Sequence, residues 1–199
     1  MSDDSSIICA MARPLSDVKR NAILNAAAKL VATHGTGAST PQIARAAKVA
    51  EGTVFIYFET KDALLNELFV VLETGLFRAI EEAFPFKGDA NDQLQHVWSA
   101  LIEWGASRAI DRQALRQLKV SERVTSDSRD RCAAQYGKVL ASIEASLKGR
   151  VDPKRMSFYL GHVLMSLVET TLDAITANPK QRNTLKQAGF DLFWKGIQR

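Results

Sequence analysis

The prolines of this 199-residue chain divide it into segments that carry the helical repeat of apolar side chains. All five prolines fall where one repeat ends and the next begins. Proline is tolerated there because its ring fixes φ and its nitrogen carries no hydrogen, so it suits the first turn of a helix and not the interior. Strand-like alternation and Asn-Gly or Asp-Gly hairpin turns are scarce. The sequence therefore predicts an all-α fold of about nine helices, over residues 16–34, 40–47, 51–58, 61–83, 92–108, 111–120, 127–148, 153–177 and 179–196.

Composition excludes several classes of protein. With 46% hydrophobic and 24% charged residues, the chain can bury a core. Two cysteines are too few for a disulfide scaffold or a multi-cysteine zinc module. No apolar run reaches the roughly 18 residues that cross a bilayer, and Asp3 and Asp4 stand where a signal peptide carries positive charge. We therefore expect a cytoplasmic protein.

Enzyme and metal signatures are not apparent. His34, His96 and His162 are scattered, without the spacing of a metal site. The sequence has no Gly-x-Ser-x-Gly, P-loop or Gly-x-Gly-x-x-Gly motif. Cys132 lies in a helical stretch, which favours a packed thiol over a nucleophile. We predict no catalytic residues, no metal, no cofactor and no enzymatic activity.

Charge is distributed unevenly along the chain. Residues 13–61 hold seven basic and three acidic side chains, a net charge of +4, whereas residues 62–199 carry only +2. A basic N-terminal part suits an anionic partner. We expect a disordered tail over 1–14, a nucleic-acid-binding domain over 15–60 and a second helical domain over 61–199.

The most informative segment is STPQIARAAKVAEGTVFIYFETK, residues 39–61, which predicts a short helix, a tight turn and a second short helix. This is the helix-turn-helix pattern, in which the second helix enters the major groove of DNA. Its inward-facing apolar residues would pack against the helix at 16–34. The residues left to face outward are Thr40, Gln42, Arg45, Lys48, Glu51, Thr53, Phe55, Ile56 and Tyr57.

The segment GTVFIYF, residues 52–58, taken alone suits a buried strand equally well, because β-branched and aromatic residues favour strands. No partner strand is visible and helical segments flank it closely, so we favour a helix. Its exposed apolar side chains then need a role, and contact with sugars, phosphates or thymine methyl groups supplies one.

Residues 20–68 resemble the DNA-binding region of the tetracycline-repressor (TetR) family of bacterial transcriptional regulators. The matching residues are Arg20, Ile23-Leu24, Ala26-Ala27, Gly35, Thr40, Ile43-Ala44, Val49, Gly52-Thr53, Phe55, Tyr57-Phe58, Lys61 and Leu64. The resemblance implies that Thr40 and Lys61 meet phosphates and that Thr53, Ile56 and Tyr57 lie along the groove. Two positions depart from the family pattern: Phe55 stands where tyrosine is usual, and Lys48 where the turn usually has glycine.

The resemblance further implies a two-fold dimer and an effector cavity in the remaining helices. The helix at 153–177 is apolar over more than half its circumference, so it must bury two sides. One side would face a twin subunit, although a fully internal helix is the alternative. We predict an interface containing Leu160, Leu164, Leu167, Thr171, Leu192 and Phe193.

Candidate effector contacts come from the aromatic residues of the middle helices. We predict a pocket containing Trp98, Trp104, Tyr136 and Glu169, with plain core packing as the alternative for each aromatic and a surface ion pair as the alternative for Glu169. The helix at 61–83 joins the two domains and is the expected lever between them.

Together these features predict a homodimeric, ligand-responsive DNA-binding regulator. We expect it to be a repressor that binds a palindromic operator in double-stranded DNA and is released by a partly hydrophobic small molecule. One alternative is a constitutive or architectural DNA-binding protein without an effector. Another is a helical carrier or enzyme that retains the DNA-binding part as a relic.

Overall fold

The computed structural model describes residues 16–198, which form eleven α-helices and, within that range, no strand. The all-α prediction is therefore confirmed. The expected tail over 1–14 lies outside the described residues. The helices are α1 (Asp17–His34), α2 (Thr40–Ala46), α3 (Glu51–Tyr57), α4 (Lys61–Glu81), α5 (Ala90–Ser107), α6 (Ala109–Lys119), α7 (Ser126–Gln135), α8 (Gly137–Ser146), α9 (Pro153–Phe158), α10 (Leu164–Ala177) and α11 (Arg182–Ile197).

Two of the nine predicted helices are interrupted, which accounts for the larger number. The helix expected over 127–148 divides at Tyr136 into α7 and α8, and a π-helical turn, η2 (Tyr159–Val163), separates α9 from α10. Each interruption contains or adjoins a glycine, Gly137 or Gly161, and glycine is a poor helix former. One short 3₁₀ turn, η1 (Gly35–Gly37), follows α1, and another, η3 (Pro179–Gln181), precedes α11.

Side chains and glycine mark several helix ends. The Thr60 side chain accepts a hydrogen bond from the Ala63 backbone N–H at 3.0 Å and begins α4. Gly35, at φ +67°, ends α1, where a left-handed conformation favours glycine. The Ser39 hydroxyl caps α2, and Thr40 is the first residue of that helix.

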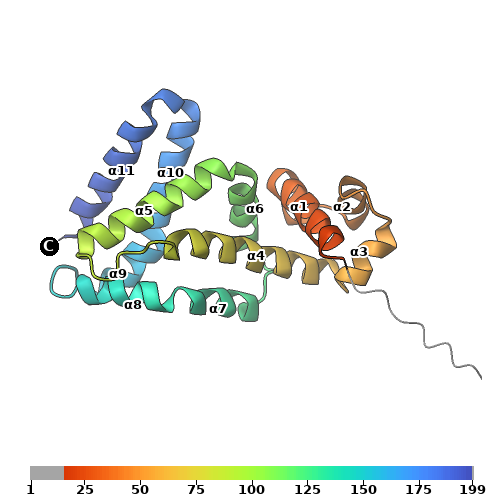
Figure 1. Ribbon diagram of the computed structural model, residues 1–199, viewed down its shortest axis with the longest axis horizontal. Coiled ribbons are helices and arrows are strands. Elements are labelled where there is room, and N and C mark those ends of the chain that lie inside the picture. Colours follow the sequence, from red (N-terminus) through yellow and green to blue (C-terminus); the bar gives the residue numbers. More distant parts are fainter. Residues whose placement is uncertain (1–15, 199) are drawn as a thin grey trace, which may run out of the picture.

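The helices form two regions joined by α4. We call α1–α3 the head and α4–α11 the body. In Figure 1 the head lies at the right-hand end of α4, and the body surrounds the rest of that helix, with α5 above it and α7 and α8 below it. Leu64, Leu65 and Leu68, near the start of α4, are buried, because that part of the helix packs against the head and against body helices at once.

The head also docks directly on the body. The pairing of α1 with α6 is the most extensive between any two elements of the described chain. The Ser121 hydroxyl, just after α6, lies 3.4 Å from the Thr36 hydroxyl in η1. The Arg20 guanidinium forms an ion pair with Glu67 of α4. The head is thus attached through both α4 and α6.

Within residues 16–198, no helix combines the length and the apolar character that a membrane span requires. The same residues contain no group of three or more His, Cys, Asp and Glu side chains placed to hold a metal ion. Cys132 is buried at 3% exposure, and burial, together with the nearby Glu73 carboxylate, raises the pKa of its thiol.

Candidate nucleic-acid interface and ligand cavity

Helices α2 and α3 form a helix-turn-helix. At the start of α2, Ser39 and Gln42 form a reciprocal cap: the Gln42 N–H donates to the Ser39 hydroxyl at 3.4 Å, and the Ser39 N–H donates to the Gln42 side-chain carbonyl at 3.0 Å. This pairing satisfies backbone donors that the first turn leaves free. Ile43 and Ala44 are buried, so the inner face of α2 packs on the head.

The turn between α2 and α3 places Lys48 in the left-handed region, at φ +57°. The Val49 N–H donates to the Ala44 carbonyl at 3.0 Å and closes the turn. A side chain costs about 1 kcal/mol in this conformation relative to glycine. The turn therefore keeps the geometry that glycine favours and presents a lysine ammonium at the surface.

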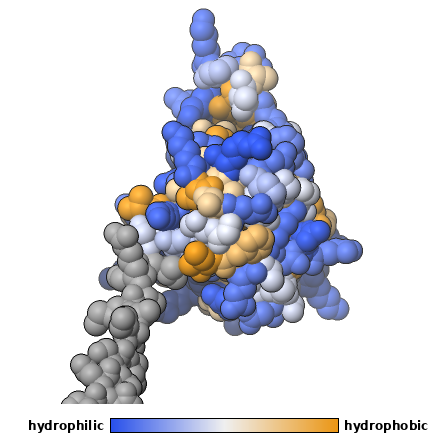
Figure 2. All heavy atoms as spheres, turned by 90° about the vertical axis from the view of Figure 1, so that its right-hand side faces the viewer, coloured by the Kyte–Doolittle hydropathy of each residue, from blue (hydrophilic) through white to orange (hydrophobic). Residues whose placement is uncertain are grey.

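Helix α3 carries apolar side chains on its outer face. Val54 is buried, whereas Phe55 is 45% and Ile56 66% exposed. The helical interpretation of this segment is confirmed, because Glu51–Tyr57 is a single α-helix. Figure 2 looks onto the head end of the molecule and shows apolar side chains at the surface among polar ones. Exposed residues of this kind beside basic side chains suit contact with base edges and thymine methyl groups.

The sequence-predicted contact residues all come from α2, the turn, α3 and the start of α4. Six are exposed, namely Gln42, Arg45, Lys48, Glu51, Phe55 and Ile56; Thr53, Tyr57 and Lys61 are half-buried. Thr40, expected to face outward, is instead buried at 9% exposure. The Tyr57 hydroxyl accepts a hydrogen bond from the Ser16 N–H at 2.9 Å, which ties α3 to the beginning of α1.

Lys61 has a neighbour that sequence reasoning missed. The loop after α6 brings Arg123 to the start of α4, where its guanidinium lies 2.7 Å from the Asp62 carboxylate. Partial burial lowers the pKa of Lys61, Arg123 lowers it further, and Asp62 raises it. Arg123 is 62 positions from Lys61 in the sequence, so no local pattern indicated this basic pair.

The predicted pocket residues do not share one cavity. Trp98 is buried in the packing of α5 on α11, with its indole N–H donating to the Lys186 carbonyl at 2.9 Å. Trp104 and Glu169 line a cavity of about 530 Å³ between α5, α6 and α10, which we call the outer cavity. Tyr136 lines an adjoining space of about 190 Å³, the inner chamber.

Charged side chains line the outer cavity on two walls. Arg112, Arg116 and Lys119 come from α6, and Glu169 and Asp173 from α10. The Arg112 guanidinium lies 3.3 Å from Glu169 and 3.4 Å from Asp173, and that of Arg116 lies 3.4 Å from Glu169. Glu169 thus does form an ion pair, and it does so at the cavity wall.

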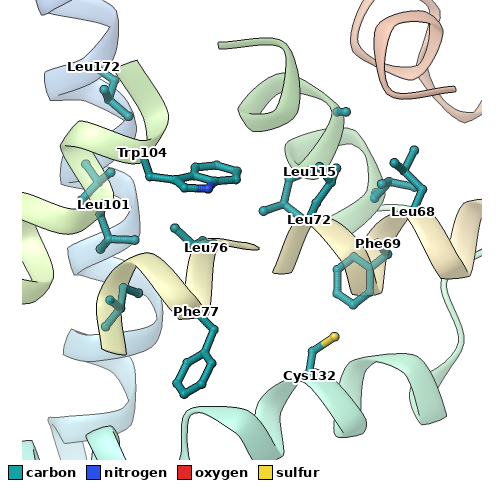
Figure 3. Packing of buried hydrophobic residues seen from close by; sticks show 14 of the residues in the cluster. Leu68, Phe69, Leu72, Leu76, Phe77, Leu101, Trp104, Leu115, Cys132 and Leu172 are labelled. Atoms are coloured by element: carbon teal, nitrogen blue, oxygen red, sulfur yellow. The ribbon is translucent and has the colours of Figure 1, made fainter. Parts of the chain in front are cut away.

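Trp104 forms part of the apolar wall of this cavity. In Figure 3 its indole projects from α5 into the space between Leu76 of α4 and Leu115 of α6. The position of Gly105 lets the helices approach closely, because a Cβ there would lie 2.5 Å from the Leu172 side chain of α10. The cavity is therefore bounded by closely packed helices.

The inner chamber is lined mostly by aliphatic side chains, among them Ile80, Val97, Val139, Ile143 and Leu164. Its polar residues are paired with one another. The Tyr136 hydroxyl donates to the Glu73 carboxylate at 2.8 Å, and the Lys119 ammonium lies 2.9 Å from the same carboxylate. Burial and the Glu73 charge raise the pKa of Tyr136, so its hydroxyl stays protonated.

The predicted interface residues divide into three sets. Leu164, Thr171 and Phe193 are already buried within one chain, at 4%, 7% and 1% exposure. Leu192 is 63% exposed, and with the half-buried Leu167 it lines an apolar groove of about 460 Å³ between α10 and α11. Leu160 faces the inner chamber instead.

Comparison with known proteins gives one family match. Residues 23–68 match the model of the bacterial regulatory proteins of the tetR family. This segment runs from the inner face of α1 through α2 and α3 to the first turns of α4, so it contains the whole helix-turn-helix.

Solved structures share the fold over nearly the whole chain. A putative tetR-family transcription regulator from Shewanella sp. PV-4 is 24% identical, with a TM-score of 0.79 over 91% of this chain and 98% of that one. FadR from Bacillus subtilis, solved with stearoyl-CoA, is 19% identical, with a TM-score of 0.69 over 90% and 100%. LfrR from Mycobacterium smegmatis, solved with proflavine, is 20% identical, with a TM-score of 0.67 over 92% and 99%.

Proposed function

Because residues 23–68 match the model of the bacterial regulatory proteins of the tetR family, we propose that the chain is a member of this family and acts as a ligand-responsive transcriptional repressor. It binds a palindromic operator as a homodimer in the cytoplasm and is released by a small-molecule effector. We place the boundary at Thr60, so that 15–60 bind DNA and 61–199 bind the effector and the second subunit. No catalytic step is part of this function.

The outer face of the helix-turn-helix carries this proposal. Exposed Arg45 and Lys48 supply positive charge for phosphates, and exposed Ile56 supplies an apolar contact for base edges. Lys61, at the first turn of α4, meets a phosphate with the help of the helix dipole. Phosphate contacts position the head, and α3 reads the sequence.

The groove between α10 and α11 is the proposed dimer interface. Leu192 and Phe158 are 63% and 57% exposed there, and apolar side chains of this size gain most from burial against a second copy. A two-fold dimer sets two heads about 34–36 Å apart, the spacing of successive major grooves on one face of DNA.

Helix α6 supplies the link between effector and operator. One part of it, Arg112, Arg116 and Lys119, lines the outer cavity, and the helix also packs along α1 of the head. A ligand that binds more tightly when α6 is in one of two positions shifts the equilibrium towards that conformation. The spacing between the two heads of the dimer then changes with it. The complexes of FadR with stearoyl-CoA and of LfrR with proflavine support an effector site in this fold.

Selection of binding sites from a random DNA pool, at fixed near-physiological salt, tests the proposal. We expect an enriched palindrome whose half-sites are about one helical turn apart. Ile56→Ala should change the enriched half-site, and Val18→Ala, at an exposed position of α1, should not. If the affinity for DNA depends on salt concentration alone and no sequence is enriched, the proposal of a sequence-specific repressor is contradicted.

A further inference from the structure

The outer cavity and the inner chamber adjoin each other. Charged side chains line much of the outer cavity, whereas mostly apolar side chains line the inner chamber. Leu76, Leu101 and Lys119 line both spaces. At the outer end, the side chains of Arg116 and Asp173 are 55% and 62% exposed. A ligand that fills both spaces therefore has a polar end near Arg116 and an apolar part among the aliphatic side chains of the inner chamber.

An unpaired hydrogen-bond donor indicates the charge of the polar end. The Arg112 Nε–H is buried in the wall of the outer cavity and has no hydrogen-bond partner. The Trp104 indole N–H is also buried without a partner, but it faces Gly75 of α4, which does not line this cavity. Among residues 16–198, no buried side-chain acceptor is left unpaired in this way. Buried donors without acceptors cost stability, so the groups that this cavity lacks are acceptor oxygens.

The ion pairs of the outer cavity are longer than usual. Its arginine–carboxylate contacts measure 3.3–3.4 Å, whereas charge-assisted hydrogen bonds are typically about 2.7–2.9 Å. The Lys119–Glu73 pair beside the inner chamber is 2.9 Å. The contacts of Arg112 and Arg116 with these carboxylates all run through Nη1, so other N–H groups of both guanidiniums are left for a ligand anion, whereas Lys119 is paired with Glu73.

We infer that the effector is an anionic amphiphile, with a hydrocarbon part in the inner chamber and a carboxylate-type head group bound by Arg112 and Arg116. The inference deepens the proposed function, since it rests on the same cavity and names the chemistry of its ligand.

Three probes of equal chain length and different head group test this with the full-length protein. They are dodecanoate, dodecanol and dodecyltrimethylammonium, each below the concentration at which micelles form. Dissociation constants are measured by calorimetry, and unfolding midpoints by circular dichroism. We expect dodecanoate to bind at least tenfold more tightly than the other two and to raise the midpoint most. Tighter binding of the cation or equal binding of all three would overturn the inference.

Arg112→Gln and Arg116→Gln locate the head group. The first removes a buried cation that contacts Glu169 and Asp173, so the unliganded protein should also lose stability, whereas Arg116, 55% exposed, can be replaced without that loss. Each variant should weaken dodecanoate binding roughly tenfold and leave dodecanol binding unchanged. The matched control is Arg131→Gln, at a 61%-exposed side chain of α7 that lines neither space. Variants no weaker than this control would also overturn the inference.

Operator binding, measured by fluorescence anisotropy, distinguishes the proposed repressor function from the proposed ligand chemistry. If dodecanoate binds as expected but leaves operator affinity unchanged, the ligand chemistry holds and release by an effector fails. If the protein binds a specific operator but no probe binds, the ligand inference fails and the DNA-binding part of the function stands.

Discussion

The head and the body use the same helical packing for opposite purposes. The head is filled by small side chains at closely approaching helices, with Ala26, Ala27 and Ala44 at 3%, 0% and 3% exposure. The body is built from larger residues and encloses the outer cavity and the inner chamber. The contrast suits the proposed function, in which the head presents a rigid surface to DNA and the body leaves space for a ligand.

Truncation of a buried side chain should affect the head more than the cavity wall. Ile43→Ala, at a fully buried position of α2, should cost about 2–5 kcal/mol of unfolding free energy, because the cavity it leaves cannot collapse. Leu160→Ala, at the half-buried wall of the inner chamber, should cost distinctly less because that wall already faces empty space. Denaturant unfolding measures both; equal losses would contradict the contrast in packing.

The apolar outer face of α3 should contribute to DNA recognition and not to folding. Ile56→Ala should change unfolding free energy by less than about 0.5 kcal/mol, since the side chain is 66% exposed. Discrimination between operator and mismatched DNA should fall by about 1–3 kcal/mol if it contacts a base. Val18→Ala, 79% exposed on α1, is the control for a general effect of surface apolar residues. A stability loss without a specificity change would assign Ile56 to packing.

Lys61 should influence affinity without influencing sequence preference. Its loss in Lys61→Ala removes one phosphate contact, so operator and nonspecific binding should both weaken and the slope of log K against log salt should fall by about one unit. Lys138→Ala, at an exposed position of α8 in the body, should leave the slope unchanged. A wild-type slope for Lys61→Ala would remove Lys61 from the phosphate contacts.

The smallest expected effect concerns the surface of the body. Desolvation raises the pKa of Glu103, but hydrogen bonds and charges from Lys186 and Arg182 outweigh it, so the net pKa is lowered. A carboxylate with a lowered folded-state pKa adds stability above its unfolded pKa, about 4.3, and loses it as pH falls through the folded value. Glu103→Gln should therefore slightly reduce stability at neutral pH and flatten its loss in acid. Thermal unfolding from pH 7 to pH 3 measures this, with Glu144→Gln, exposed on α8, as control.

The sequence predicted the head in detail because its signals are local. The Thr60 cap, the glycine that ends α1 and the segment GTVFIYF each lie within a few residues of the feature they specify. Even the strained turn was visible, because Lys48 stands at a position of the pattern usually held by glycine. The exception is Thr40, whose burial depends on packing against other helices.

The body was predicted only as a set of helices. Periodicity shows that a side chain is buried but not against what, so Trp98 and Trp104 looked alike in the sequence. The fold placed Trp98 against α11 and Trp104 at the outer cavity.

The sequence by itself determined the all-α class, the order of the helices and the helix-turn-helix, because helix propensity, caps and turn residues act over a few positions. Only the tertiary structure decided that α6 packs on α1, that Arg123 reaches the start of α4, and that Arg112 meets Glu169 57 positions away. These contacts join residues distant in the chain, and the packing of whole helices selects them.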